Sequence, residues 1–346
     1  MESRPTANPP NRFRKVEVTY DDSDDAPPRS SVTLLEDHSR SILAHNDSPD
    51  LGFRWSVNPY RGCMHSCAYC YARPSHEYLD LGAGTDFDTK IVFKPRAAEL
   101  LREAFDKPSW RGELVVFSGV TDCYQPVEAQ LGLTRACLEV CLEYRNPVGL
   151  ISKSALVERD VALLAELARE AGCHVSVSLA FADAALARSI EPWAPAPERR
   201  LRVIETLAKA GVPVGVMCAP IMPGLNDDQM VRVLERARDA GATSAAWVLL
   251  RLPGAVATVF EERVRVALPL AADKIMHRIR ETRGGDKLYD PRFGVRGRGT
   301  GAYAETIAAL FDATVARLGL GDRDDARAVD QPSRFRRPQR GQLSLF

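Results

Sequence analysis

Three cysteines in one short loop carry the strongest chemical signal in this sequence. Cys63, Cys67 and Cys70 lie in the stretch RGCMHSCAYCYARP with the spacing C-x3-C-x2-C. Thiolates are the usual ligands of iron–sulfur clusters, and three of them can each hold one iron of a cube. The fourth iron then has no protein ligand and stays open to a substrate, as catalytic metal sites usually do. The spacing therefore predicts a catalytic 4Fe–4S cluster.

A zinc ion is the alternative occupant of this loop. Zinc needs a fourth ligand, which His65 or His76 could supply. Ligand preferences favour an iron–sulfur cluster over zinc for three thiolates so spaced. We therefore interpret His65 as a loop residue that lies near the cluster.

The cysteines beyond the loop form no second motif of this kind. Cys137 and Cys141 are one helical turn apart in the apolar stretch TRACLEVCLEY, and Cys173 and Cys218 stand alone. A free cysteine packs as a small hydrophobic side chain, so Cys137 and Cys141 are expected in the core. Enzymes that hold several clusters carry extra cysteine sets, which this sequence lacks.

Apolar runs rich in β-forming residues alternate with helical patterns along the middle of the chain. Strands are expected at 54–59, 113–118, 147–151, 174–180, 212–218 and 243–250. Helices are expected between them at 94–106, 130–144, 155–171, 198–210 and 227–240, then at 257–281 and 303–318, because their apolar residues recur at three- and four-residue steps. This alternation predicts an α/β fold, a partial (βα)6 TIM-like barrel of parallel strands with outer helices.

Three regions are expected along the chain. Residues 1–50 are rich in Pro, Ser, Asp and Asn and should form a mostly irregular N-terminal lead-in. Residues 51–320 should form the barrel with a C-terminal helical extension. Residues 321–346 have few large apolar side chains and should form a flexible tail.

Polar residues follow several predicted strands. In parallel α/β barrels the chemistry gathers at the carboxyl ends of the strands. Ser118 and Thr121 follow the second strand and Lys153 follows the third, where it could pair with a carboxylate. Ser176 and Ser178 share one face of the fourth strand, with polar filling of the barrel interior as the alternative interpretation.

Charged residues farther along the chain allow two interpretations. Glu191 and Arg200 could pair across the loop after the fourth strand, or lie on the surface. A Gly-rich segment after residue 283 lacks the lysine spacing of a phosphate loop. Its arginines could contact a phosphate backbone or simply be solvated; they are Arg283, Arg292, Arg296 and Arg298.

Together these features resemble the radical S-adenosylmethionine superfamily. The stretches TDCYQPVE, ISKS, IEPWAPAPERRL and PIMPGLND resemble the branch related to spore photoproduct lyase. NPPNRF, SRSIL, NPYRGC and YARPSHEYL resemble one bacterial group in that branch, often labelled DNA repair photolyase-like, and the resemblance covers about 8–346. It implies that S-adenosylmethionine binds the open iron. One electron, from a donor such as flavodoxin or ferredoxin, would then cleave it to a 5′-deoxyadenosyl radical.

The resemblance also assigns cofactor-binding positions. An aromatic residue before the third cysteine usually lies by the adenine, and here it is Tyr69. In the lyase, a serine at the second strand end, a lysine after the third strand and a serine on the fourth lie near S-adenosylmethionine. The matching positions here are Ser118 or Thr121, Lys153, and Ser176 or Ser178.

The sequence departs from the lyase at its hydrogen donor. The lyase has a hydrogen-donating cysteine at the end of its second strand, where this chain has Ser118 and Gly119. Cys123 follows a few residues later and is the candidate for this catalytic role from a shifted position; an inert thiol is the alternative. Spore photoproduct repair is therefore not expected to transfer intact.

The composition gives no hint of a nucleic-acid or membrane partner. Lys+Arg and Asp+Glu both total 46, so only a local patch could attract a polyanion. No run of roughly 18 apolar residues occurs, and the first residues lack the apolar run of a secretory signal. We expect a cytoplasmic protein with reduced thiols and no membrane partner.

The last five residues suggest a protein partner. Gln342, Leu343, Ser344, Leu345 and Phe346 resemble the pentapeptide by which bacterial polymerases and repair proteins bind the sliding clamp. Apolar side chains on a polar tail usually have a partner, and a short extended segment in a groove is a common recognition mode. The preceding arginines would favour a position near DNA. The alternative is that the tail packs back on the barrel.

Three functions are consistent with these features. The first is a radical enzyme that acts on nucleic acid, for DNA repair or modification. The second is a radical enzyme that acts on a small metabolite or peptide. The third is a non-catalytic iron–sulfur or zinc protein associated with DNA.

Overall fold

The computed structural model describes residues 8–13, 32–322 and 333–338. In these residues the main sheet has the strand order β11-β10-β9-β8-β7-β6-β3-β2. The edge strand β2 is antiparallel to β3, and the other neighbours are parallel. The bounds are β2 (Leu43–His45), β3 (Trp55–Val57), β6 (Val115–Phe117), β7 (Val148–Ser152), β8 (Cys173–Ser178), β9 (Val214–Ile221), β10 (Ser244–Leu249) and β11 (Gly321–Asp322).

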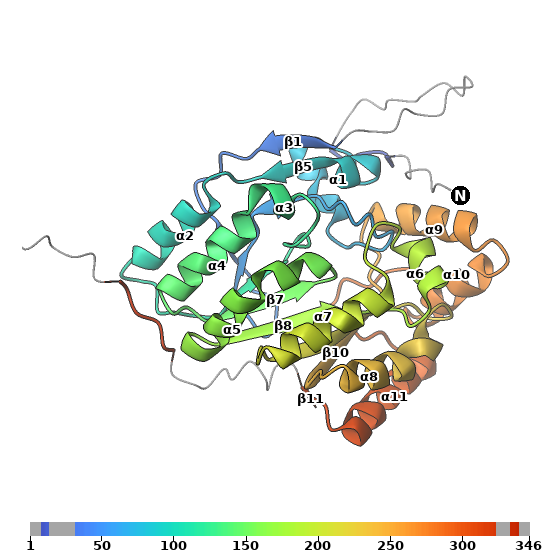
Figure 1. Cartoon of the computed structure of the whole chain (residues 1–346). Helices are drawn as coiled ribbons and strands as arrows, with labels where there is room; N and C mark the ends of the chain where they lie inside the picture. The colour runs from blue at the N-terminus through green and yellow to red at the C-terminus, as the bar shows by residue number, and fades with distance from the viewer. Residues whose placement is uncertain (1–7, 14–31, 323–332, 339–346) are drawn as a thin grey trace, which may run out of the picture.

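The predicted α/β fold is confirmed. The six predicted strands are β3 and β6 to β10, and all six run parallel. Helices lie between successive strands and cover one face of the curved sheet (Figure 1). They are α2 (Ala97–Asp106), α3 (Glu128–Leu131), α4 (Leu133–Glu143), α5 (Val161–Glu170), α7 (Pro197–Lys209) and α8 (Met230–Asp239), with the short turns η3 (Ala155–Asp160) and η4 (Asp227–Gln229) before α5 and α8.

The main core fills the space between the strands and these helices. Side chains alternate between the two faces of a strand. On β8, Val175 and Val177 pack into this core with helix residues such as Leu164 of α5. The serines of β8, Ser176 and Ser178, therefore face the opposite, concave side of the sheet, although they too are buried.

Helix boundaries follow the backbone preferences of glycine and proline. The chain leaves α5 at Gly172 and α7 at Gly211, whose φ angles of 94° and 77° lie in the left-handed region. The region 257–281, predicted as one helical stretch, forms α9 (Val256–Ala267) and α10 (Ala272–Glu281). Pro269 separates them because it has no N–H to donate. The last helix is α11 (Ala302–Leu318), and α6 (Ala184–Ile190) lies beside α9 (Figure 1).

No described helix is long and apolar enough to span a membrane.

A smaller sheet and part of the lead-in cover the cysteine loop. The strands β1 (Thr33–Glu36), β5 (Lys90–Phe93) and β4 (Tyr60–Arg61) pair in the order β1-β5-β4. β1 and the edge strand β2 both lie within residues 1–50, which we expected to be mostly irregular. The described lead-in is therefore tied to the barrel at two places by strand pairing.

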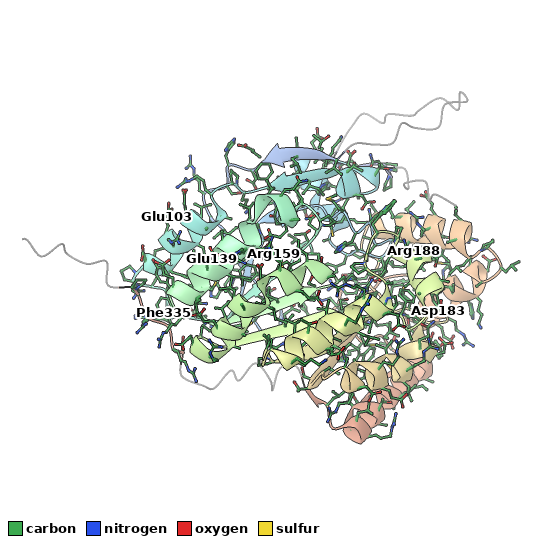
Figure 2. The ribbon with its side chains drawn as sticks, in the orientation of Figure 1. Glu103, Glu139, Arg159, Asp183, Arg188 and Phe335 are labelled. Carbon is green, nitrogen blue, oxygen red and sulfur yellow. The ribbon has the colours of Figure 1, made fainter. Side chains whose placement is uncertain are left out.

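Residues 333–338 differ from the predicted flexible tail because they dock on the core. The Phe335 ring packs 6.0 Å from Phe105 and 6.2 Å from Tyr144, measured between ring centres. Arg337 donates to the carbonyls of Phe105, Lys107 and Trp110. Figure 2 shows Phe335 at the α2 and α4 end of the molecule, far from Asp183 and Arg188 beside α6. Arg337 is thus occupied with protein carbonyls.

We expect Phe335→Ala to lower the free energy of unfolding by about 1–3 kcal/mol, because it removes a half-buried ring from an aromatic group. Chemical denaturation measures the change. Phe293→Ala is the control, since 57% of Phe293 is exposed. Equal stability of the two variants would contradict the docking of this segment.

Candidate active site

The cysteine loop follows β4 at the carboxyl ends of the strands. Cys63 and Cys67 are buried, and Cys70 is half-buried. The loop turns at Gly62, whose φ is 79°, and a Cβ atom there would lie 2.9 Å from both His76 and the Phe87 carbonyl. Only glycine fits this turn without displacing its neighbours.

A buried arginine holds the loop from inside. The Arg73 guanidinium donates twice to the Cys67 carbonyl, at 3.1 and 3.0 Å, and once each to the carbonyls of Ala83 and Gly84. It also forms an ion pair with buried Asp88 at 3.0 Å. Sequence reasoning did not find Arg73, because nothing in its spacing distinguishes it from a surface arginine.

The segment after β6 holds the loop from the other side. The Thr121 hydroxyl donates to the Gly62 carbonyl at 2.5 Å, and Gln125 donates to the same carbonyl at 2.9 Å. The Gln125 side chain also accepts from the Met64 amide. Thr121, predicted to bind the cofactor, thus already donates its hydroxyl proton to the loop backbone.

The side chain of Cys63 lies next to two charged side chains, His65 and Asp122. His65 Nδ1 is 3.4 Å from Asp122 Oδ2, and Asp122 also accepts from the Ser152 hydroxyl and the Lys153 amide. Burial opposes ionisation of both groups, but the His65 charge and these hydrogen bonds lower the pKa of Asp122 to about 2, and Cys63 together with Asp122 raises the pKa of His65 to about 10. Burial also raises the Cys63 pKa, but His65 outweighs it and the pKa falls overall. Cys63 is thus favoured as the thiolate, the form that binds metal.

Burial and the neighbouring loop thiols raise the pKa values of Cys67 and Cys70. Burial raises the pKa of Cys67 well above that of an ordinary cysteine, and burial with the nearby Cys63 raises that of Cys70 to about 11. Among the described residues, no three His, Cys, Asp or Glu side chains converge as they would around one metal ion. Thiolates that bind different irons surround a cluster and need not meet at one point.

Lys153 and Tyr69 meet beside the loop. The Lys153 ammonium lies 5.6 Å from the centre of the Tyr69 ring, and its charge opposes the raised pKa values of Cys67 and Cys70. No carboxylate of the described chain pairs with this ammonium. The sequence-based expectation that Lys153 could receive a carboxylate therefore agrees with its surroundings.

Glu191 and Arg200 form the pair that the sequence allowed. Both are buried, and Arg200 donates to Glu191 and to the Ser178 carbonyl. The Tyr69 hydroxyl donates to the same carboxylate. The pair thus ties the cysteine loop to the exit of β8, and the surface alternative was wrong.

The predicted serines have different surroundings. The Ser176 hydroxyl is buried without a hydrogen-bond partner in the described structure, whereas Ser178 donates to the Ala219 carbonyl at 3.3 Å. Ser118 has a φ of 80°, and its hydroxyl accepts from the Cys123 amide at 3.1 Å. Ser176 therefore has the clearest unused capacity for a ligand.

Cys123 lies away from the cluster cysteines. Its thiol is fully buried in the main core with Cys137 and Cys141, which confirms the core prediction for the latter two. Burial raises the Cys123 pKa well above the usual value. The hydrogen-donor role of Cys123 stays a prediction.

The arginines of the Gly-rich segment are largely engaged within the protein. Arg283 is buried and donates to three carbonyls. Arg292 pairs with Asp290 and Arg296 with Asp50, while Arg298 lies over the Trp247 ring. Arg283 and Arg296 are thus used within the protein, whereas Arg292 and Arg298 are exposed, and contact of these two with a phosphate backbone stays a prediction.

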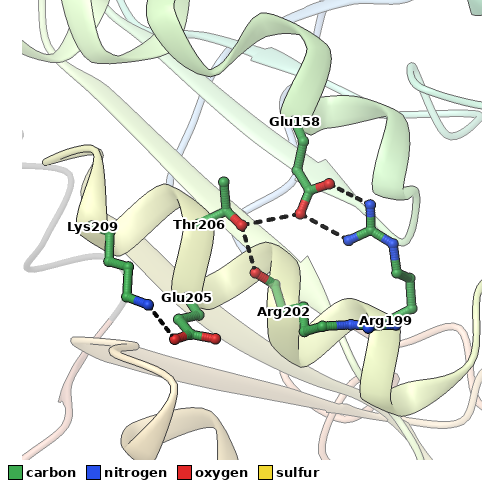
Figure 3. A pocket seen from close by; sticks show the side chains of 6 residues that line it. All are labelled: Glu158, Arg199, Arg202, Glu205, Thr206 and Lys209. Atoms are coloured by element: carbon green, nitrogen blue, oxygen red, sulfur yellow. Dashed lines mark hydrogen bonds and ion pairs between the residues drawn. The ribbon is translucent and has the colours of Figure 1, made fainter.

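A surface hollow of about 410 Å³ lies between η3 and α7 (Figure 3). Glu158 accepts from Arg199 and Thr206, and Lys209 pairs with Glu205. Arg199 and Lys209 are thus paired with acids, while Arg202 also lines the hollow. The hollow lies on the outer helix layer, separate from the strand ends that carry the cysteine loop.

The family model described as "Radical SAM superfamily" matches residues 57–237, which include the cysteine loop and β3 to α8. The chain belongs to the radical SAM superfamily. Members bind a 4Fe–4S cluster and S-adenosylmethionine, which are therefore the cofactors of this chain. The predicted cofactors are confirmed at the level of the family.

Similar proteins support this membership. An uncharacterised protein of Mycobacterium tuberculosis is 39% identical over 66% of this chain and 68% of its own length. An uncharacterised protein of Methanocaldococcus jannaschii is 28% identical over 52% of this chain and 65% of its own. Spore photoproduct lyase with bound AdoMet and dinucleoside spore photoproduct has a TM-score of 0.60 at 12% identity, over 84% of this chain and 80% of the lyase. This last likeness shows a shared fold.

The residues present fit the radical SAM cofactors. Three neighbouring thiols can hold the cluster, with Cys63 favoured as the thiolate. The Lys153 ammonium and the unpartnered Ser176 hydroxyl offer a cation and a hydrogen-bonding group for S-adenosylmethionine. The Tyr69 ring, which belongs to the loop, lies beside the Lys153 ammonium, and its position by the adenine stays a prediction.

We expect Arg73→Gln to lower the free energy of unfolding by about 3–5 kcal/mol, because it leaves Asp88 buried without its ion-pair partner. Chemical denaturation of the apoprotein measures this loss, and iron content after anaerobic reconstitution reports the loop. Arg96→Gln is the control because its ion pairs with Glu99 and Glu103 are exposed. A wild-type unfolding curve for Arg73→Gln would contradict its role.

Proposed function

We propose that this chain is a radical SAM enzyme that acts on nucleic acid, in a lyase-like reaction of DNA repair or modification. Its cluster and S-adenosylmethionine supply a 5′-deoxyadenosyl radical. Cys63, Cys67 and Cys70 hold the cluster, and Lys153, Ser176 and Tyr69 hold S-adenosylmethionine. The observation that carries the proposal is the buried three-thiol loop with the unpaired Lys153 ammonium beside it.

A nucleic-acid substrate is supported by the fold likeness. Spore photoproduct lyase complexed with dinucleoside spore photoproduct shares the fold over 83% of this chain, with a TM-score of 0.59 and 14% identity. A dinucleoside ligand therefore has a precedent in a protein of this fold, which supports a nucleic-acid substrate, while Cys123 departs from the lyase donor position.

We expect the reconstituted, reduced protein to convert S-adenosylmethionine to 5′-deoxyadenosine, and Cys63→Ala to abolish this product by removing a cluster ligand. Liquid chromatography with mass spectrometry measures the product. Cys173→Ala is the matched control, because Cys173 is a buried cysteine at the start of β8, outside the loop. Product formation by Cys63→Ala, or none by a fully loaded wild-type protein, would refute the radical chemistry.

A sliding-clamp partner is part of the proposal. Gln342, Leu343, Leu345 and Phe346 lie outside the described residues, so the proposal rests on the sequence QLSLF. The nearest described segment, 333–338, docks by α2 and α4 through Phe335 and Arg337.

We expect the full chain to capture a bacterial sliding clamp in a pull-down, and a chain lacking residues 342–346 to lose it. Leu345→Ala with Phe346→Ala should also lose capture, because a groove-bound segment is anchored by its apolar side chains. Ser344→Ala keeps those side chains and serves as the control. Equal capture by the intact and shortened chains would exclude the motif.

A further inference from the structure

A cavity of about 520 Å³ opens beside the cysteine loop. Asn58, just after β3, and Val120, after β6, form its floor at the carboxyl ends of two parallel strands. The side-chain oxygen Oδ1 of Asn58 accepts from the Val120 amide at 3.0 Å, which joins the two strand ends. Val120 also packs against the buried group that contains Cys63. The cavity and the cluster loop therefore share a wall.

The cavity is lined by cations and by no acidic side chain. Arg40 comes from the segment before β2, Arg61 from β4 and Lys94 from the end of β5. Within the described residues, neither arginine has an acidic partner. The nearest carboxylate, Asp37, lies 3.9 Å from the Lys94 ammonium. Three cations thus face one space with a single acid nearby.

Two polar groups in the cavity wall, those of Lys94 and Ser75, have few or no hydrogen-bond partners. Only 11% of the Lys94 side chain is exposed, and its ammonium makes a single long contact, 3.4 Å, with the Ser41 carbonyl. Burial lowers the Lys94 pKa, and Asp37 opposes this only in part. The Ser75 hydroxyl is buried in the wall without a partner among the described residues. A buried cation and a buried hydroxyl both gain from an acceptor-rich ligand.

We propose that this cavity binds a phosphate group of the substrate, next to the radical site. Arginine forks and a lysine suit a phosphate, which offers several charged oxygens at once. Ile42, Leu43 and Ala44 line the other side and suit the sugar or base attached to it. The inference rests on the proposed nucleic-acid substrate and deepens it. A backbone phosphodiester occupies the cavity, so the neighbouring nucleoside faces the cluster loop.

Fluorescence anisotropy with a labelled single-stranded oligothymidylate tests the site on the reconstituted, unreduced protein. Lys94→Gln should weaken binding about tenfold, the effect of losing one charged hydrogen bond. The slope of log affinity against log salt should become less negative by about 0.7, which corresponds to one phosphate contact on a single strand. Lys94→Arg should retain binding.

Two further variants separate the site from folding and from net charge. Arg40 is exposed at the cavity mouth, so Arg40→Gln tests the cavity without altering a buried side chain. Arg111→Gln removes an equal charge just before β6, at the amino ends of the strands, and should bind as the wild type does. Equal affinities for wild type, Lys94→Gln and Arg40→Gln would overturn the proposal.

The source of the phosphate is distinguished by two probes. An oligothymidylate with an uncharged methylphosphonate backbone should bind to the wild type at least as weakly as the charged oligonucleotide binds to Lys94→Gln. Inorganic phosphate, titrated by calorimetry, should compete with the oligonucleotide. If phosphate binds through Lys94 while the oligonucleotide does not bind, the cavity serves a phosphorylated small molecule and the nucleic-acid part of the proposed function fails. If neither binds, the cavity proposal fails, while the 5′-deoxyadenosine assay still decides the radical chemistry.

Discussion

The loop that carries Cys63, Cys67 and Cys70 is buried but forms neither a helix nor a sheet strand, so its backbone carbonyls need partners from elsewhere. Arg73 donates hydrogen bonds to the Cys67 carbonyl, and Thr121 and Gln125 each donate a hydrogen bond to the Gly62 carbonyl. Arg73 is itself buried, and the Asp88 carboxylate compensates its buried charge. The position of three sulfur atoms thus depends on one buried ion pair and on the loop after β6.

The same dependence extends across the barrel. Tyr69, between two cluster cysteines, donates to Glu191, which pairs with Arg200 at the start of α7. Asp122 joins the Ser152 and Lys153 end of β7 to His65 in the loop. Buried polar groups that pair with one another favour one arrangement of the strand ends over others. Residues from β6, β7 and β8 therefore position the cysteine loop jointly.

The sequence could predict what depends on local pattern. Strands such as β8 and helices such as α7 have strong periodicity, α7 is followed by Gly211, and the cysteine spacing is a local motif. β1 and β2 are only four and three residues long, and they exist because β5 and β3 offer them edges. Arg73 gains its role only when residues 83–88 fold beside it. Such features depend on contacts between distant segments, which no local pattern reveals.

The charge balance shows why composition could not locate a binding surface. Lys+Arg and Asp+Glu are equal in number, yet they are not distributed equally. On the helix layer, Arg96 pairs with Glu99 and Arg135 pairs with Glu139. Because the two charges of each exposed pair cancel, they produce little net electrostatic field at the surface.

At the strand ends, the acids Asp88, Asp122 and Glu191 are buried against their own partners. The positive charges that remain near the cluster loop are those of Lys153 and of the cavity cations Arg61 and Lys94. A chain with zero net charge can therefore present a positive catalytic end, because its acidic residues are neutralised inside the protein or on its outer helices.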